Sequence, residues 1–357
     1  MSERLQGLLR SDATSYAIGA VLAVVVGGLV LLALGTDPFT AMDSLIRGAF
    51  GNAHNFGNTL TLAAPIALAG LAVVIPLEAK LLNVGGDGQL LVGALAAVAL
   101  SLIFPEIAIV GAIVLLIAGG IAGALWASVP GVGRAKLGVN EVVATILLNF
   151  TALALLSWAV NHPLREKAGI YPQTDRVPDV FLLPKVGEML QAHIGILIAV
   201  AAVPIVAFVL AKTMAGYRLR ITGSSDEVAR YLGISRVRFV IGSMAVGGFL
   251  AGLAGAIQML GVQGRLIEGF NPGYGFDGLV AAFLGGGRPI ATGVAALVLG
   301  ALRAGGAELE VTTQVPASAV VMLQAILIIS TLVTRFAVGR YRAQRALARH
   351  REAPAAA

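Results

Sequence analysis

The stretch Leu81–Gly93, LLNVGGDGQLLVG, places three polar side chains and four glycines inside a region that is otherwise apolar enough for a lipid bilayer. In an ordinary helix each glycine costs about 1 kcal/mol relative to alanine, and an aspartate at bilayer depth costs about 2.5–3.5 kcal/mol. A broken helix avoids these costs, because irregular backbone is tolerated where it lies in protein or beside water. We therefore predict a turn at the glycines 85, 86 and 88, and a half-helix that begins near Gln89 and is capped by Asp87 or a neighbour.

The composition of the chain is that of a membrane protein. Apolar residues make up 57% of the 357 residues and charged residues only 12%, whereas about a quarter of the residues in a soluble domain are charged. The mean hydropathy of +0.88 agrees, and we interpret the chain as an all-α polytopic membrane protein. It contains no cysteine, which excludes disulfides, thiolate metal ligands and a cysteine nucleophile. The four histidines are scattered, so no metal site is predicted.

The apolar segments define the membrane spans. A transmembrane helix needs about 20 mostly apolar residues, and on this criterion we expect about ten spans in a single transmembrane domain, residues 1–357. The eighth and ninth segments are too short for ordinary spans, and nine or eleven spans also fit the sequence. The predicted spans are 15–35, 59–77, 81–104, 107–128, 140–160, 191–211, 238–260, 277–287, 289–304 and 317–335.

The distribution of lysine and arginine predicts the orientation. With the N-terminus inside, 18 of the 25 basic residues fall in cytoplasmic segments, including a basic tail at 336–357, as the positive-inside rule expects. Both termini are therefore expected in the cytoplasm of a bacterial cell, with the spans in its inner membrane, and the basic residues indicate topology rather than nucleic-acid binding. The exceptions are Arg47, Arg165, Lys167, Arg176, Lys185, Arg265 and Arg303.

Two external segments are more than connectors. Asp37 and Pro38 form a good N-cap and N1 pair, and the apolar residues that follow, up to Phe50, favour one helix face. We expect a helix that lies along the outer interface. The other segment, residues 161–190, is the longest loop in the chain and contains four prolines. Loops of this length are usually functional or disordered, and docking or gating fits as well as an ordered cover.

The predicted break has two interpretations. A half-helix end directs backbone N–H groups and a positive dipole into a cavity, as the discontinuous helices of transporters do toward polar substrates. Asn83, Asp87 and Gln89 would then line a substrate pathway. In the second interpretation, these side chains satisfy one another and the nearby backbone in a packed kink. A possible internal repeat is suggested by Gly85, Gly86, Gly93 and Ala96, which recur 200 residues later at Gly285, Gly286, Gly293 and Ala296.

Other polar side chains lie within or beside the spans. In GVNEVVATILLNF, Asn140 suits an N-cap, and Glu141, Thr145 and Asn149 follow at four-residue steps on one helix face. This stripe fits both interhelical hydrogen bonding and a pore lining, so Glu141 and Asn149 are pathway candidates. Asp277 opens the eighth span and could line an external vestibule or cap its helix.

The segment 216–238, between the sixth and seventh predicted spans, has the pattern of a short helix. Ser224 and Glu227 have the spacing of a capping box, Val228, Tyr231 and Leu232 share a helical face, and Gly233 can end the helix. A short amphipathic helix outside the bilayer is predicted, with an apolar stripe that needs a partner. That partner is either the lipid headgroup region, favoured by the basic residues nearby, or a protein that supplies energy.

Three motifs together resemble one family. GSSDEVARYLGI at 223–234 resembles the coupling-helix motif of ATP-binding-cassette importer permeases, in the branch that serves branched-chain amino acids, simple sugars and nucleosides. LNVGGDGQLLVGA at 82–94 resembles the early signature of that branch, and GVNEVVATILLNF at 138–150 resembles a stretch of its nucleoside-type members. The spacing agrees as well, so the resemblance covers nearly all of residues 20–335.

The resemblance implies one half of an importer for a polar solute, a nucleoside or otherwise a simple sugar. Such permeases pair with a second permease, with cytoplasmic ATPases and with an external substrate-binding lipoprotein. A helix at 224–234 would then sit in the ATPase cleft, where ATP is used by the partner and this chain has no catalytic residue or cofactor of its own. The residues at the matching motif positions are Ser224, Glu227, Arg230, Tyr231 and Gly233.

Two other functions are compatible with the composition. An ion-coupled secondary transporter would use Asp87, Glu141 or Asp277 to carry protons or sodium. A membrane-embedded enzyme is disfavoured, because no nucleophile, base and metal-ligand set is clustered in the sequence. The chain also carries no GxxxxGK[ST] phosphate-binding loop, so ATP hydrolysis would belong to a partner.

Overall fold

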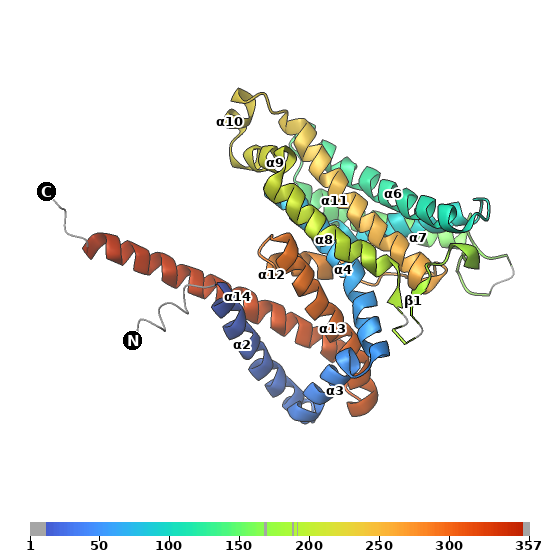
Figure 1. Cartoon of the computed structure of the whole chain (residues 1–357), viewed down its shortest axis with the longest axis horizontal. Helices are drawn as coiled ribbons and strands as arrows, with labels where there is room; N and C mark the ends of the chain where they lie inside the picture. Colours follow the sequence, from blue (N-terminus) through green and yellow to red (C-terminus); the bar gives the residue numbers. More distant parts are fainter. Residues whose placement is uncertain (1–11, 168–169, 188, 191, 353–357) are drawn as a thin grey trace. The chain divides into compact units, whose positions relative to one another are not determined.

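The computed structural model describes residues 12–167, 170–187, 189–190 and 192–352 (Figure 1). The chain divides into a larger unit, Ala49–Ala301, and a smaller unit made of Met1–Gly48 and Leu302–Ala357. Both units are built from apolar helices, and the described residues contain only one small pair of strands. The all-α fold expected from the composition is thereby confirmed.

The larger unit contains most of the helices. Its one hairpin pairs β1 with β2 in antiparallel fashion, with Lys185 opposite His193. The elements are α4 (Ala53–Glu78), α5 (Gly86–Ser101), α6 (Ala108–Leu137), α7 (Glu141–Asn161), η1 (Asp179–Phe181), β1 (Lys185–Val186), β2 (Ala192–His193), α8 (Gly195–Lys212), α9 (Met214–Ser224), α10 (Asp226–Tyr231), α11 (Arg236–Gln258), the π-helix η2 (Met259–Gln263), α12 (Tyr274–Leu284) and the first half of α13 (Pro289–Thr313).

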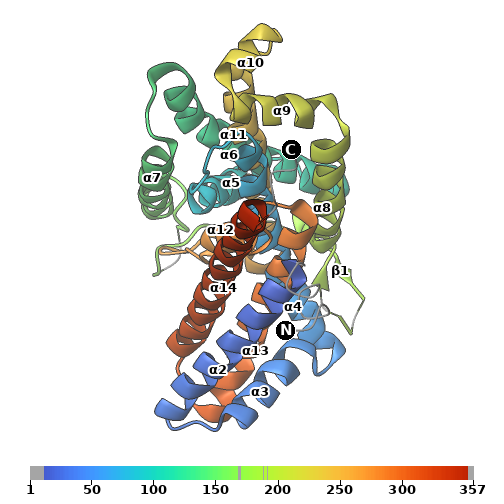
Figure 2. The ribbon, with the colours of Figure 1, turned by 90° about the vertical axis from the view of Figure 1, so that its left-hand side faces the viewer.

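The core of the larger unit forms around α4 and α11. Of the membrane-spanning window of α4, 78% is buried inside the protein, against 28% for α7 and for α8. A helix that is apolar all round and largely buried lies at the centre, whereas one that is apolar and exposed faces lipid. The hairpin and the α9–α10 pair lie at opposite ends of this unit (Figures 1 and 2).

Glycines allow the central helices to approach one another closely. Gly119 and Gly123 of α6 form one GxxxG motif, and Gly248 and Gly252 of α11 form another. The two motifs face each other, because a Cβ atom at Gly248 would overlap the carbonyl oxygen of Gly123, and one at Gly252 would overlap that of Gly119. Gly93 of α5 packs against Gly252 in the same way. These small residues therefore bring three helix backbones together.

The smaller unit consists of α2 (Asp12–Ala33), α3 (Pro38–Phe50), α14 (Ala317–Glu352) and the second half of α13. α2 and α3 meet at an angle of 114°. The predicted N-cap is confirmed, because the Asp37 carboxylate accepts from the Thr40 amide at 2.8 Å. Phe39 and Ile46 are exposed on α3, which fits a helix at an apolar interface.

Each of the ten predicted segments corresponds to one helix, but their lengths differ from expectation. The described residues contain seven helices long and apolar enough to cross a membrane, or eight if α2 and α3 count as one bent span. α5 and α12 are shorter apolar helices. The prediction that the ninth segment ends at 304 was wrong, because α13 extends to Thr313. Gly305 and Gly306 do not end the helix; a Cβ atom at either would overlap Leu45 or Val320.

The two glycine pairs related by the 200-residue sequence offset differ in local structure, whereas the other two matched positions lie in helices in both stretches, α5 and α13. Gly85 and Gly86 stand at the start of α5, whereas Gly285 follows the last turn of α12. Gly286 and Gly287 have positive φ values of 63° and 72° and turn the chain toward α13. The two glycine pairs therefore have different local conformations, and an internal repeat stays a prediction.

Candidate functional site

The break predicted before α5 is present. α4 ends at Glu78, Lys80 has a positive φ of 55°, and the chain is non-helical from 81 to 85. α5 then begins at Gly86, three residues earlier than expected, and its N-cap Gly85 has no capping side chain. Of the two predicted alternatives, Asp87 or a neighbour, Asp87 is therefore not the cap, and the N-cap position belongs to its neighbour Gly85. Asp87 lies in the first turn of α5, and its carboxylate bonds a neighbouring helix instead.

Asn83 and Gln89 hold the break together. Asn83 Oδ1 accepts from the amide of Gly85 at 3.1 Å, and Asn83 Nδ2 donates to the carbonyl oxygen of Ala72 at 3.2 Å. The two side-chain amides also form a reciprocal pair, with Gln89 Nε2 donating to Asn83 Oδ1 at 2.9 Å and Asn83 Nδ2 donating to Gln89 Oε1 at 3.0 Å. Both side chains are buried. They satisfy the polar backbone of the break, which would otherwise be costly in an apolar surrounding.

Asp87 joins α5 to α12. Its Oδ1 accepts from the amide of Gly275 at 2.7 Å, and Gly275 lies in the first turn of α12. A Cβ atom at Gly86 would lie 3.1 Å from the Cα of Gly275, and one at Gly275 would overlap the amide of Asp87. The N-termini of two short helices therefore meet within the larger unit, where α12 lies beside α5 (Figure 2). A carboxylate between two positive dipole ends is favourable to both.

Asn149 ties α7 to the break. Its Oδ1 accepts from the amide of Gly88 at 2.8 Å, and its Nδ2 donates to the carbonyl oxygen of Val84 at 2.9 Å. Glu141 and Thr145, the other two members of the predicted polar stripe, form no hydrogen bond with the break in the way that Asn149 does. The Thr145 hydroxyl donates to the Glu141 carbonyl oxygen at 2.7 Å, and the Glu141 carboxylate lies 3.2 Å from Nε of Arg134.

Asp277 lies in the first turn of α12 and is half-buried. Its amide donates to the carbonyl oxygen of Gly273 at 3.1 Å, so it begins the regular hydrogen bonding of the helix. Asp277 and Asp87 thus belong to the first turns of the two short helices. Whether any of these side chains contacts a solute stays a prediction.

The segment between α8 and α11 forms two short helices at the end of the larger unit, α9 and α10. The capping-box prediction was wrong in register. Ser225, and not Ser224, is the N-cap of α10, and its hydroxyl accepts from the amide of Val228 at 3.4 Å. Ser224 instead ends α9, where its hydroxyl donates to the carbonyl oxygen of Ile221 at 3.0 Å. Gly233, with φ of 69°, follows α10 as expected.

The predicted apolar stripe is exposed on α10. Tyr231 is 92% exposed, and Val228 and Leu232 are about half exposed. Glu227 and Arg230 are exposed as well. An exposed aromatic side chain on a short helix is typical of a contact surface rather than of a core. The structure therefore leaves this face of α10 without a partner among the described residues.

α9 is attached to the end of α4, just before the break. Arg220 Nη1 donates to the carbonyl oxygen of Leu210 at 2.6 Å and lies 3.8 Å from the carboxylate of Glu78. A Cβ atom at Gly223 would come within 2.7 Å of the Glu78 carbonyl oxygen and 2.8 Å of the carbonyl carbon of Ala79. Sequence reasoning missed these contacts and that of Gly275. In the sequence, the glycine that precedes Ser224 and Ser225 was the one sign of a close contact at α9.

A comparison with known protein families identifies the family of this chain. The family described as branched-chain amino acid transport system, permease component, matches residues 55–332. The chain belongs to this permease family. The family resemblance inferred from the three motifs is thereby confirmed, and the role of the chain is transport across a membrane rather than catalysis.

Relatives of the permease cover most of its length. The glucose ABC transporter permease protein TsgB13 of Haloferax volcanii is 37% identical over 332 residues, which are 90% of this chain and 87% of TsgB13. The guanosine permease protein NupP of Bacillus subtilis is 32% identical, covering 90% of this chain and 94% of NupP. The nucleoside permease protein NupB of Lactococcus lactis is 30% identical, covering 81% and 82%. In each organism a second permease protein also matches, at 29%, 27% and 25% identity respectively.

The segment 161–190, which is predicted to be external, is held by contacts with the rest of the larger unit over most of its described length. The ring of Phe181 is fully buried against Gly111 of α6, where a Cβ atom would overlap it. The amide of Thr174 donates to the carbonyl oxygen of Leu266, and that of Leu183 to the carbonyl oxygen of Leu260, both at 2.9 Å. Residues 168–169 and 188 of the predicted loop lie outside the described part of the chain.

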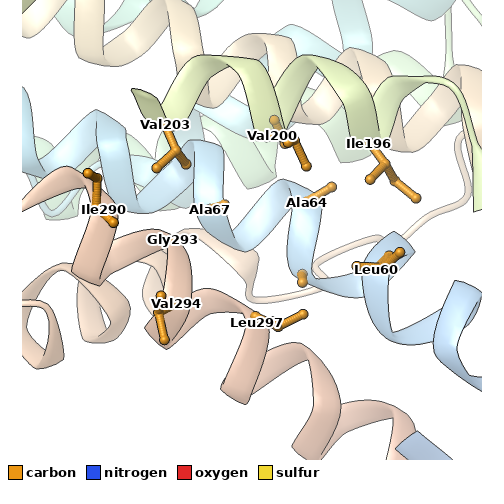
Figure 3. A pocket seen from close by; sticks show the side chains of 12 residues that line it. Leu60, Ala64, Ala67, Ile196, Val200, Val203, Ile290, Gly293, Val294 and Leu297 are labelled. Atoms are coloured by element: carbon orange, nitrogen blue, oxygen red, sulfur yellow. The ribbon is translucent and has the colours of Figure 1, made fainter. Parts of the chain in front are cut away.

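One cavity of the permease is too apolar for a polar solute. It has a volume of about 280 Å³ and lies between α4, α8 and α13, where only aliphatic side chains and a glycine line it (Figure 3). Sugars and nucleosides need hydrogen-bonding partners, and a buried polar group without one costs free energy. Within the described residues, no group of three His, Asp or Glu side chains could hold a metal ion.

Proposed function

We propose that this chain is the membrane-spanning subunit of an ATP-driven importer that moves a nucleoside inward by alternating access. The observation that carries this proposal is the meeting of α5 and α12 at their N-termini, with the Asp87 carboxylate bonded to the Gly275 amide. Helix starts of this kind place backbone N–H groups and positive dipole ends inside a membrane protein. Such groups can bind a polar solute without a dedicated charged side chain.

The solute pathway would run beside the first turns of α5 and α12. Asn83 and Gln89 are occupied by each other and by backbone groups, so their proposed role is to shape the break. Asp87, Asn149 and Asp277 remain the candidates closest to the pathway, because each belongs to or holds one of the two helix starts. Glu141 would act through its ion pair with Arg134 at the start of α7.

Energy would enter through α10. The exposed face with Val228, Tyr231 and Leu232 suits the cleft of a cytoplasmic ATPase, and Glu227, Arg230 and Gly233 flank it. α9 carries α10 and rests on Glu78 and Ala79, the residues directly before the break. Closure of the ATPase would therefore displace α9, then the end of α4, and then the start of α5.

The remaining subunits follow from the same proposal. A second, homologous permease would complete the pathway, which is consistent with the second permease proteins found among the relatives. An external lipoprotein would deliver the solute to the side that carries the loop 161–190. Both termini would lie in the cytoplasm, with the spans in the inner membrane.

A simple sugar is the second candidate solute, because the glucose permease TsgB13 is 37% identical to this chain. The test is uptake of labelled guanosine into proteoliposomes that contain this chain, its partner permease, the ATPase and the lipoprotein, with unlabelled adenosine or glucose as competitors. The nucleoside proposal predicts competition by adenosine and none by glucose. Uptake of labelled glucose without uptake of labelled guanosine would assign the sugar instead.

A further inference from the structure

A groove opens between α8 and α11 at the end of the larger unit that carries α9. It has a volume of about 460 Å³, within the range of about 300–1,000 Å³ that is common for ligand pockets. Its walls are mostly apolar, and two of its lining residues, Ile205 and Val246, are 59% and 51% exposed. α8 and α11 are both apolar and long enough to cross a membrane, so the exposed residues of the groove are expected to face hydrocarbon.

One cation lines this groove. Arg238, in the first turn of α11, is exposed and makes no ion pair with a carboxylate in the described residues. Two neighbouring arginines are already engaged, since Arg220 bonds the Leu210 carbonyl oxygen and Arg236 lies 2.6 Å from the Asp226 carboxylate. An exposed guanidinium that lines an apolar groove can form a strong charge-assisted hydrogen bond with an anion that also carries an apolar part.

We propose that this groove binds one anionic phospholipid, with an acyl chain between α8 and α11 and its phosphate on Arg238. Such a lipid matches both properties of the groove, because its acyl chain fits the apolar walls and its negative charge at the membrane surface fits Arg238. Basic pockets between transmembrane helices are a known setting for such headgroups. The acyl chain would lie against Gly216 and Leu219 of α9, so this site goes beyond solute transport and is distinct from the break at α5.

Gly242 offers a way to close the groove without disturbing the helices. It lines the groove, and a Cβ atom built there meets no atom within 4 Å. Gly242→Leu is therefore expected to fold and to fill the space of the acyl chain. Gly242→Ala adds one methyl group, leaves the groove open and serves as the matched control.

The experiment measures lipid binding to the full chain, purified with its partner subunits, by native mass spectrometry. Palmitoyl-oleoyl phosphatidylglycerol is titrated against phosphatidylcholine with the same chains. We expect preferential retention of phosphatidylglycerol, about fivefold weaker binding in Arg238→Gln, and binding at least about tenfold weaker in Gly242→Leu. Gly242→Ala and Lys136→Gln, which removes an exposed charge elsewhere, should bind like the unmodified chain.

Three results would overturn the proposal. Equal retention of both lipids would show that the groove does not select an anion. Unchanged binding in both Arg238→Gln and Gly242→Leu would place the lipid elsewhere. Because the chain contains no cysteine, a single Gly242→Cys can also be tested for cross-linking in the assembled transporter. Cross-linking to the second permease would mean that a protein, and not a lipid, fills the groove.

Discussion

At the residue scale, the meeting of the N-termini of α5 and α12 depends on Asp87. It is almost fully buried and bonds the first-turn amide of α12 from the first turn of α5. An aspartate that is buried in a membrane protein is costly unless hydrogen bonds and favourable dipoles compensate it. Here one side chain supplies an acceptor to a helix start that would otherwise lack one.

Substitutions at Asp87 separate the hydrogen bond from the charge. Asp87→Leu leaves the Gly275 amide without its acceptor, and the free energy of unfolding should fall by about 1–3 kcal/mol. Asp87→Asn keeps an oxygen at the same place, so its stability should stay within about 1 kcal/mol of the parent. Thermal unfolding in detergent measures both. Equal stability of the leucine variant and the parent would mean that the bond does not hold α12.

His193 on β2, outside the spanning helices, should make stability pH-dependent. Its ring is buried against Gly195 and Gly261, and neither ring nitrogen has a hydrogen-bond partner among the described residues. Burial lowers the pKa of His193 from 6.5 to about 4. Between these values the unfolded chain binds a proton that the folded chain does not, so stability should fall as the pH drops from 6.5 to 4, by up to roughly 3 kcal/mol.

The control for this pH dependence is a second histidine. His193→Leu should flatten the decrease in melting temperature between pH 6.5 and 4, whereas His162→Gln, at an exposed position, should leave it unchanged. A decrease that persists in full in the His193 variant would assign the effect to other groups.

At the scale of elements, the contact between α9 and the end of α4 determines how motion would reach the break. Gly223→Ala places a methyl group 2.7 Å from the carbonyl oxygen of Glu78, so the two helices must separate. We expect a loss of about 1–3 kcal/mol in stability and reduced ATP-dependent uptake by the assembled transporter. Gly242→Ala, where the added methyl group meets open space, is the matched control. Full uptake by the Gly223 variant would exclude this route.

The sequence predicted individual elements better than the contacts between them. The break at 81–85 was predictable, because glycines and polar residues in an apolar run would destabilise a continuous membrane helix. The partners of the break were not, since Asn149 and Gly275 come from distant parts of the chain and only the tertiary fold brings them together. Caps shifted by one residue, as at Ser225, because neighbouring serines offer the same chemistry.

The extent of α13 shows a second limit of sequence reasoning. Gly305 and Gly306 resemble a helix end on local propensity, yet both lie inside the helix and allow close packing within the smaller unit. The same residue type ends α10 at Gly233. Only the presence or absence of a packing neighbour distinguishes the two uses, and this information is not local.

At the scale of the whole molecule, ATP coupling is proposed to occur through the exposed face of α10. Tyr231 has almost no contact within the chain, so Tyr231→Ala should change stability by less than about 0.5 kcal/mol. The same change should nonetheless abolish ATP-dependent uptake if α10 transmits the movement of an ATPase. Substitution of exposed Lys136 on α6 by alanine should leave uptake intact.

The most direct test is uptake of labelled guanosine into proteoliposomes, measured for the assembled transporter with ATP and for this chain alone under a proton or sodium gradient. Coupling through α10 predicts ATP-dependent uptake by the complex, loss of that uptake in Tyr231→Ala with an unchanged melting temperature, and no uptake by the chain alone. Gradient-driven uptake by the chain alone, or full ATP-dependent uptake by the Tyr231→Ala complex, would contradict it.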